Sequence, residues 1–525
     1  MADPQFLLGI IVAIFLVVIS VIILFHWWEP KKYDYWRKNG IPFVDPLLPV
    51  QNEKPFNEIL VERHQKLGEI YGYFEGEKPK ISIGNPALVK SILIKDFSFF
   101  KGRRPIVTGD EVHDKMLTLA RGDDWKRIRS IVSPIFTTGK LKKLLHIFKD
   151  CSQALIENLK SAAEEEKSID LKSVYGAFTT DVIAGAIFSA KVDSHDDPGN
   201  QFVRTARDVF GGKPGKRPTA IPVLSRLLKL FKTDHAASSR TEIFRKITLQ
   251  IVEERKKSGQ TRNDFLQLLM DSAEEISEGK KSDSIGKEAS IDSNFDEPTP
   301  EHQTLEIVSK KLSMNELVGQ CLIFFLAGYE TTSSTLSFAT HLLALHQDIQ
   351  DKLREEVAKT LSETNGELTY EAIQNMTYLD NVISETLRLY PPATQLERYA
   401  DADYELGDSG ITIPKGMGVT IPVYAVQRDL KFFTDPERFY PDRFATKTWD
   451  PYSYLPFGAG PRNCVGMRFT LLEIKICLSY VVANFKIKRS PQTKEKLEFH
   501  SVPGFLRPKE IVVEMEIRKN SFEIK

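Results

Sequence analysis

The residues best suited to take part in chemistry lie in a glycine-rich loop near the C-terminus, residues 457–466, with the sequence FGAGPRNCVG. Its glycines and proline fix an irregular backbone that can closely approach a flat partner. Cys464 lies in this loop just before residues 467–482, whose amphipathic pattern predicts a helix. A helix N-terminus favours a thiolate, which binds soft metal ions. The alternative is a small buried cysteine in a turn, the commoner role of an isolated cysteine.

A second group of chemically capable residues is the stretch AGYETT, residues 327–332. It lies within a predicted long helix, which begins at a capping box formed by Ser313 and Glu316 and runs to about residue 345. A mid-helix glycine costs about 1 kcal/mol relative to alanine, and adjacent β-branched threonines add to that cost. Either the helix kinks, with a hydroxyl bonded back to a carbonyl, or an acid and a hydroxyl are placed there to relay protons.

Two further pairs have helical spacing. Glu385 and Arg388 are three residues apart, which allows an ion pair across one turn and, taken alone, is usually a surface salt bridge. Trp125 and Arg129 are four apart on a predicted helix that Asp123 or Asp124 could cap. Taken alone, the second pair is typical of ordinary packing.

The cysteine loop resembles the haem-binding signature of the cytochrome P-450 superfamily. The resemblance implies that Cys464 is the proximal ligand of a haem iron, that its electron donation helps to cleave dioxygen, and that Arg462 pairs with a haem propionate. All the recurring positions of the signature are matched, namely Phe457, Gly458, Gly460, Arg462, Cys464 and Gly466.

The same resemblance assigns roles to the other landmarks. Gly328 would make room for dioxygen, while Glu330 and Thr331 would relay protons to it. Glu385 and Arg388 would form a buried network with Arg438 that supports the haem loop. The implied propionate and further cationic contacts are Trp125, Arg129, Arg103 and Arg398. The implied lining of the substrate cavity is Phe324, Phe325, Leu396 and residues 503–506.

The elements that must position these residues make a mainly α-helical chain with a minor β part. Helices are expected over residues 141–159, 241–254, 348–361 and 378–389, and strands over 410–413, 419–422 and 511–517. Residues 272–303 are polar and predict a surface loop. Residues 213–232 alternate basic and apolar residues, which is typical of a membrane-surface helix or of a solvated amphipathic helix.

The N-terminus predicts a membrane anchor, because residues 6–25 carry no charge and are long enough to cross a bilayer. A cleaved signal peptide is the alternative, although no basic segment precedes the apolar run. The basic residues that follow place the rest of the chain in the cytosol. The expected organisation is an anchor over residues 1–30, a Pro-containing linker over 31–55 and one haem-binding catalytic domain over 56–525, with a single cytochrome P-450 fold.

The bulk composition excludes some partners. The 71 basic residues balance the 71 acidic ones, so no overall field favours nucleic acid. The four cysteines have neither disulfide-framework nor zinc spacing, which favours free thiols in a reducing compartment.

The resemblance implies a haem b monooxygenase that inserts one oxygen atom from O2 into a lipophilic substrate. Electrons would come from NADPH through NADPH-cytochrome P-450 reductase, docking on the cysteine side near Lys126, Arg127 and Lys475. Cytochrome b5 is a further implied partner, and the implied location is the endoplasmic reticulum membrane with the catalytic domain facing the cytosol. The alternatives are a haem-thiolate isomerase or dehydratase, which would not need Glu330 and Thr331, and a non-catalytic haem carrier or membrane scaffold.

Overall fold

The computed structural model describes residues 34–45, 54–104, 106–192, 194, 235–274, 311–446, 448–519 and 524, with six residues between 13 and 20. Most of the predicted anchor, residues 213–232 and nearly all of the loop 272–303 lie outside the described residues, so those expectations stay predictions. Among the described helices, none combines the length and the apolar character needed to cross a membrane.

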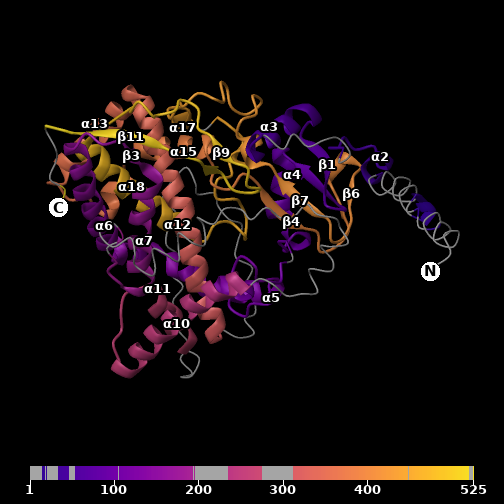
Figure 1. The fold of residues 1–525 in the computed structure, drawn as a ribbon, viewed down its shortest axis with the longest axis horizontal. Helices are drawn as coiled ribbons and strands as arrows, with labels where there is room; N and C mark the ends of the chain where they lie inside the picture. The colour runs from indigo at the N-terminus through magenta and orange to yellow at the C-terminus, as the bar shows by residue number, and fades with distance from the viewer. Residues whose placement is uncertain are drawn as a thin grey trace, which may run out of the picture.

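The largest core is helical and is built around α12 (Met314–Leu345), which runs through the middle of the molecule (Figure 1). The predicted capping box starts this helix, since the Ser313 hydroxyl accepts from Glu316 N and the Glu316 carboxylate accepts from Ser313 N. Helix α7 (Leu171–Phe188) packs along it, with α6 (Thr138–Glu164) and α18 (Met467–Asn484) beside them. The remaining α-helices of the described residues are α2 (Tyr35–Lys38), α3 (Phe56–Leu67), α4 (Pro86–Lys90), α5 (Gly122–Val132), α10 (His235–Ser258), α11 (Phe265–Glu274), α13 (Gln347–Glu363), α14 (Tyr370–Gln374), α15 (Thr377–Leu389), α16 (Val423–Val426) and α17 (Arg443–Thr446).

A smaller core lies on the other side of the molecule around a four-stranded sheet of order β1-β2-β7-β4 (Figure 1). Strands β2 and β7 are parallel and the other pairs are antiparallel. The predicted fold class, mainly α with a minor β part, is therefore confirmed. The sheet strands are β1 (Ile70–Glu75), β2 (Lys78–Ile83), β4 (Leu396–Tyr399) and β7 (Gly418–Ile421); the other strands are β3 (Ile169–Asp170), β5 (Tyr404–Glu405), β6 (Thr412–Ile413), β8 (Phe485–Lys488), β9 (Phe499–His500), β10 (Arg507–Pro508) and β11 (Val512–Ile517).

Part of the predicted linker is packed onto the body. Trp36 is 1% exposed, and its indole N–H donates to the Tyr73 carbonyl at 3.1 Å. The ring lies against Gly72, where an added Cβ would be 2.2 Å from it. The globular body therefore begins by residue 34 rather than near residue 56, because a tryptophan and a glycine on β1 fit together.

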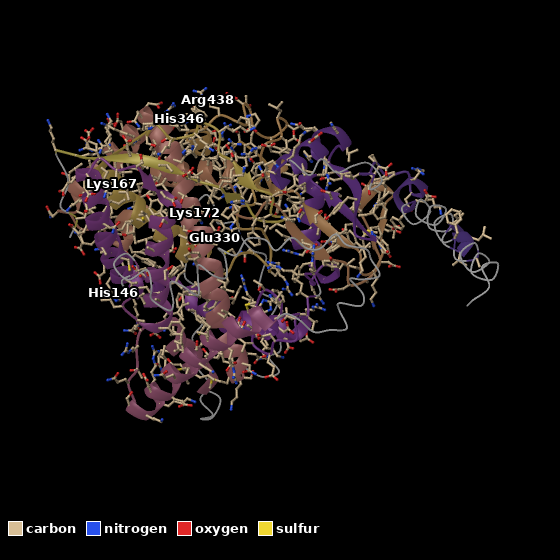
Figure 2. The ribbon with its side chains drawn as sticks, in the orientation of Figure 1. His146, Lys167, Lys172, Glu330, His346 and Arg438 are labelled. Carbon is tan, nitrogen blue, oxygen red and sulfur yellow. The ribbon has the colours of Figure 1, made fainter. Side chains whose placement is uncertain are left out.

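The buried ion network is present, but its third member was predicted incorrectly. Arg388 donates to the Glu385 carboxylate at 2.7 and 2.9 Å, and both side chains are fully buried. The second arginine on Glu385 is Arg443, at 3.0 Å. Arg438 is exposed at the edge of the molecule (Figure 2) with its guanidinium over the Tyr440 ring, and it offers only its carbonyl to Arg388 and Arg443.

Candidate active site

The cysteine loop is held by close backbone packing. Gly460 has φ +72°, and an added Cβ would lie 2.0 Å from the Leu93 carbonyl oxygen, so only glycine fits. Cys464 N donates to the Phe457 carbonyl at 2.9 Å, and Phe457 packs against the main core. Helix α18 begins at Met467 with Gly466 as its N-cap, which places Cys464 just before the helix, as predicted.

Burial opposes the thiolate form that is expected for Cys464. The pKa of the thiol is raised by burial, which outweighs the lowering by the Gly466 N–H, Arg129 and Arg103. Cys464 is nevertheless exposed, whereas Cys321 and Cys477 are buried. The helix N-terminus does favour the thiolate, but a bound metal ion must supply the rest of the stabilisation.

Four arginines converge on the same loop. The Arg103 guanidinium donates to the Arg462 carbonyl at 3.2 Å, and Arg129 donates to the Asn463 carbonyl at 3.0 Å and to its side-chain oxygen at 2.7 Å. The Arg462 guanidinium lies over the Trp125 ring, 4.2 Å from its centre. Arg398 is 2% exposed, and its Nε has no hydrogen-bond partner; the same is true of the Nε of Arg462. The five residues expected around the haem carboxylates therefore lie together.

This cluster has the character of a site for a dianion. Burial and the neighbouring guanidinium groups lower the pKa of Arg398 well below its usual value and that of Arg462 to about 9. Burial also lowers the pKa of Arg103 and of Arg129. In the described structure no carboxylate makes a salt bridge with any of the four. Buried cations without counter-charges are costly, so the cluster fits the two propionates of a haem.

The long helix meets the cysteine loop through aromatic packing. The Phe136 ring lies 5.5 Å from the Phe324 ring of α12, and it would lie 3.8 Å from a Cβ added at Gly466. On α12, Ala327 is exposed although most of the helix is buried, and Thr331 donates its hydroxyl to the Ala327 carbonyl at 2.7 Å. Thr331 is thus placed one turn from an accessible stretch of an otherwise buried helix.

The helix shows no break at Gly328, where the glycine faces a neighbouring helix. Helix α12 is continuous from Met314 to Leu345. A Cβ added at Gly328 would lie 2.8 Å from Ile183 of α7, so the glycine permits the close approach of two helices. Packing against α7 therefore accounts for the glycine, and its role toward dioxygen stays a prediction.

Glu330 has a partner that the sequence did not suggest. Its carboxylate lies 3.3 Å from Lys172 Nζ, and Lys172 also donates to the hydroxyls of Ser333 and Ser334 at 3.1 and 3.0 Å. Figure 2 shows Lys172 and Glu330 side by side where α7 meets α12. Burial lowers the pKa of Lys172. Glu330 therefore points toward α7, while Thr331, the next residue, bonds along its own helix.

The residues expected to line the substrate cavity differ in their surroundings. Phe325 is fully buried against Phe244, so it lacks the exposed face expected of a cavity lining. Phe324 packs with Phe136 and Phe265 and is half-buried, so its role as a lining residue stays a prediction. Leu396 lies near the loop, 3.7 Å from a Cβ added at Gly458. Of the segment 503–506, Phe505 is 56% exposed.

The basic residues expected to dock a reductase form ion pairs within the protein. Lys475 is 2% exposed and pairs with Asp380 at 2.7 Å, so it is unavailable on the surface. Arg127 pairs with Glu316 and Asp124. Lys126 remains partly exposed. The expectation for Lys475 is wrong because the pattern of charges along a helix does not show which face is buried. Lys126 is also paired, with Asp123 at 3.6 Å, and docking at Lys126 and Arg127 stays a prediction.

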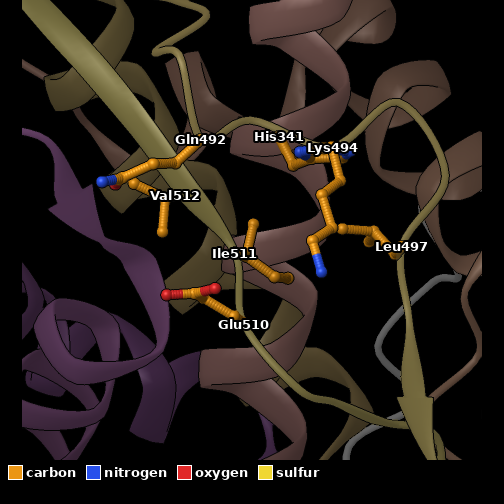
Figure 3. A pocket seen from close by; sticks show the side chains of 7 residues that line it. All are labelled: His341, Gln492, Lys494, Leu497, Glu510, Ile511 and Val512. Atoms are coloured by element: carbon orange, nitrogen blue, oxygen red, sulfur yellow. The ribbon is translucent and has the colours of Figure 1, made fainter.

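A separate pocket, lined by none of the predicted site residues, lies between the end of α12 and the C-terminal segment (Figure 3). It is too narrow to admit a water molecule. It therefore offers no binding site for a ligand. Its lining is His341, Gln492, Lys494, Leu497, Glu510, Ile511 and Val512.

Comparison with known proteins agrees with this geometry. The family model of cytochrome P450 matches residues 37–514. The chain therefore belongs to the cytochrome P450 family. It is a monooxygenase of that family, an oxidoreductase whose cofactor is haem b and whose electrons derive from NADPH through a reductase.

Three similar curated proteins share the name cytochrome P450 3A. The chain is 36% identical to human cytochrome P450 3A5 over 521 residues, covering 96% of each chain. It is 34% identical to mouse cytochrome P450 3A11 over 511 residues, covering 95% of each chain. Rabbit cytochrome P450 3A6 is 36% identical over 506 residues, with 94% of each chain covered.

Proposed function

We propose that this monooxygenase inserts one oxygen atom from O2 into a lipophilic substrate such as a xenobiotic, a steroid or a fatty-acid-like molecule. The observation that carries the proposal is the convergence of one exposed cysteine, Cys464, with four arginines that make no salt bridge to a carboxylate in the described structure. Arg398 and Arg462 are buried, and Arg103 and Arg129 are half-buried. Cys464 would bind the haem iron. Arg103, Arg129, Arg398 and Arg462, with Trp125, would hold the two propionates, while Phe457 and Gly466 shape the loop. When bound, haem supplies the activation of dioxygen.

Proton delivery is the part of the reaction that this chain's own residues perform. Glu330 is partly exposed beside Lys172, so it can exchange protons with the outside. Thr331 is its immediate neighbour and has a hydroxyl that both donates and accepts. We expect Glu330 to receive the proton and Thr331 to present it on the haem side of α12, with Lys172 holding the carboxylate in position.

The reduced, carbon-monoxide-bound spectrum tests the ligand. The wild-type protein should show the Soret band characteristic of thiolate ligation, and Cys464→Ser should lose that band while it still binds haem. A folded, haem-containing wild-type protein that lacks the band would refute the assignment of Cys464.

The proton relay is tested by coupling efficiency. Thr331→Val keeps the side-chain shape but removes the hydroxyl, and Glu330→Gln removes the acid. Both should lower product formed per NADPH by about tenfold or more, because general acid–base groups contribute at least that much. Thr335→Val is the matched control, since the Thr335 hydroxyl also bonds one turn back, to the Thr331 carbonyl at 2.8 Å. Equal losses in the control would indicate helix distortion and exclude a relay.

We also propose that the chain is anchored in the endoplasmic reticulum membrane by residues 6–25, with the catalytic domain in the cytosol. NADPH-cytochrome P-450 reductase, and cytochrome b5 as a second donor, would dock on the cysteine side, where Lys126 is partly exposed. Reconstitution with the purified reductase and substrate panels of differing polarity tests both partners. Turnover by hydroperoxide but not by NADPH with reductase would contradict this route.

A further inference from the structure

Lys80 is a buried cation in the middle of the four-stranded sheet. It lies in β2, and its side chain is 3% exposed. Its ammonium group pairs with the carboxylates of Glu397 and Glu75 and lies 5.3 Å from the centre of the Tyr399 ring. Burial by itself lowers the pKa of Lys80, but Tyr73, Glu397 and Glu75 together raise it above its ordinary value. Lys80 therefore stays charged inside the sheet.

The sheet has space built for this side chain. Lys80 is paired with Gly418 of β7, and Gly418 is paired with Tyr399 of β4, so the three residues form one row across the sheet. A Cβ added at Gly418 would lie 3.0 to 3.2 Å from three carbons of the Lys80 chain. The missing side chain at Gly418 lets Lys80 cross a whole strand and reach β4.

The residue that Lys80 reaches is the neighbour of an arginine in the candidate haem site. Glu397 precedes Arg398, and successive side chains of a strand point to opposite faces of the sheet. Glu397 also accepts two hydrogen bonds from Arg104, at 3.1 and 3.2 Å, and Arg104 follows Arg103. One carboxylate therefore ties together the residues next to two of the four clustered arginines.

The backbone holds the same two segments side by side. Gly102 and Tyr399 form an antiparallel bridge in which Tyr399 N donates to the Gly102 carbonyl at 3.0 Å. Lys80, Glu397, Arg104 and Glu75 thus form a charged clamp on this bridge. Within the clamp, Glu75 and Glu397 pair with Lys80 and Arg104. Neither carboxylate makes a salt bridge with Arg103 or Arg398 in the described structure.

We propose that Lys80 is a positioning residue for the cofactor, which fixes the two chain segments that present Arg103 and Arg398 to the haem propionates. This inference rests on the proposed haem site and adds to it a residue that lies outside that site. Removing the ammonium group would leave the half-buried Glu397 and the more exposed Glu75 with one cation fewer, and the bridge between the segments would loosen.

The test is the rate of haem loss from the purified holoprotein, followed by the absorbance change on transfer to excess apomyoglobin. Lys80→Met keeps the length of the side chain and should speed haem loss by about 10- to 100-fold, the range in which outer partners of a metal site act. Lys80→Arg should restore most of the retention. Glu397→Gln and Gly418→Ala should also speed haem loss, and they carry the test if Lys80→Met does not fold.

Arg255→Met is the matched control. Arg255 is also a buried cation with a buried acid partner, Asp264 at 2.5 Å, but it joins α10 to α11 and contacts none of the four arginines. Haem loss should be much faster in Lys80→Met than in Arg255→Met when both are compared at equal loss of thermal stability. Equal rates in the two variants would overturn the positioning role. A wild-type protein that retains no haem would instead refute the proposed function itself.

Discussion

The buried network around Glu385 gives a prediction that separates two arginines five residues apart. Arg443→Met should strongly destabilise the protein, whereas Arg438→Met should have little effect. Arg443 is 11% exposed and donates to Glu385 at 3.0 Å and to the Thr434 carbonyl at 2.9 Å. Hydrogen bonds to charged groups contribute about 1.5–3 kcal/mol each, so the loss of two sets an upper range of about 3–6 kcal/mol.

The lower half of that range is expected, because Glu385 keeps two other sources of stabilisation. The Arg388 guanidinium remains on both carboxylate oxygens, and Tyr440 N donates at 2.9 Å. We therefore expect Arg443→Met to lower the free energy of unfolding by about 3–4 kcal/mol. Arg438 contributes an exposed contact with the Tyr440 ring, 5.3 Å from its centre, which is worth about 0.5–1 kcal/mol.

Equilibrium urea unfolding of the two variants and the wild-type protein, followed by tryptophan fluorescence, measures this difference. A lower midpoint with an unchanged slope would show a loss of stability without a change in the surface exposed on unfolding. If Arg438→Met were as destabilising as Arg443→Met, the assignment of the third network member to Arg443 would be refuted.

Two other predictions concern stability and loop geometry. His341 is 1% exposed, neither ring nitrogen has a partner, and burial lowers its pKa from 6.5 to about 4. The folded protein therefore binds this proton less readily than the unfolded chain, so stability should fall by about 3 kcal/mol as the pH drops from 6.5 to 4. In His341→Leu the unfolding free energy measured across this range should lose that component, and an unchanged slope would contradict the buried neutral state. Gly460→Ala should abolish haem incorporation, because its methyl would strike the Leu93 carbonyl, whereas Gly458→Ala, with similar φ of +71° but only 3.7 Å contacts, should cost about 1–2 kcal/mol and still bind haem. Haem content of the purified variants decides this; equal incorporation would show that the loop can shift.

Local patterns were the reliable part of the sequence. The capping box at Ser313 and Glu316 fixed the start of α12, and the glycines around Cys464 fixed an irregular loop followed by a helix. Each of these depends on residues within a few positions of one another, where capping and backbone preferences act directly. Each helical or strand segment predicted within the described residues overlaps a helix or strand of the structure, because the hydrophobic pattern that predicts it is also local.

Contacts between distant residues were the unreliable part. Nothing in the sequence connects Lys172 with Glu330 or Lys80 with Glu397, because each pair is brought together only by the packing of elements far apart in the chain. The segment PERF, residues 436–439, predicts Arg438 as the network member, but a similar segment, PDRF, follows at residues 441–444 and composition cannot tell which arginine turns inward. Lys475 was taken for a surface charge because its pairing with Asp380 depends on how α15 meets α18.

The Cys464 thiol is subject to opposing electrostatic effects. A helix N-terminus and nearby arginines do lower its pKa, yet burial raises it by more. The same burial acts on the four arginines and opposes their charged form. Burial disfavours both the thiolate of Cys464 and the charged guanidinium groups. Both become favourable when one ligand brings a metal cation to the thiolate and carboxylates to the guanidinium groups. Because such a ligand binds the folded state only, its binding energy adds to the free energy of unfolding, and stability and haem retention should change together in variants of this site.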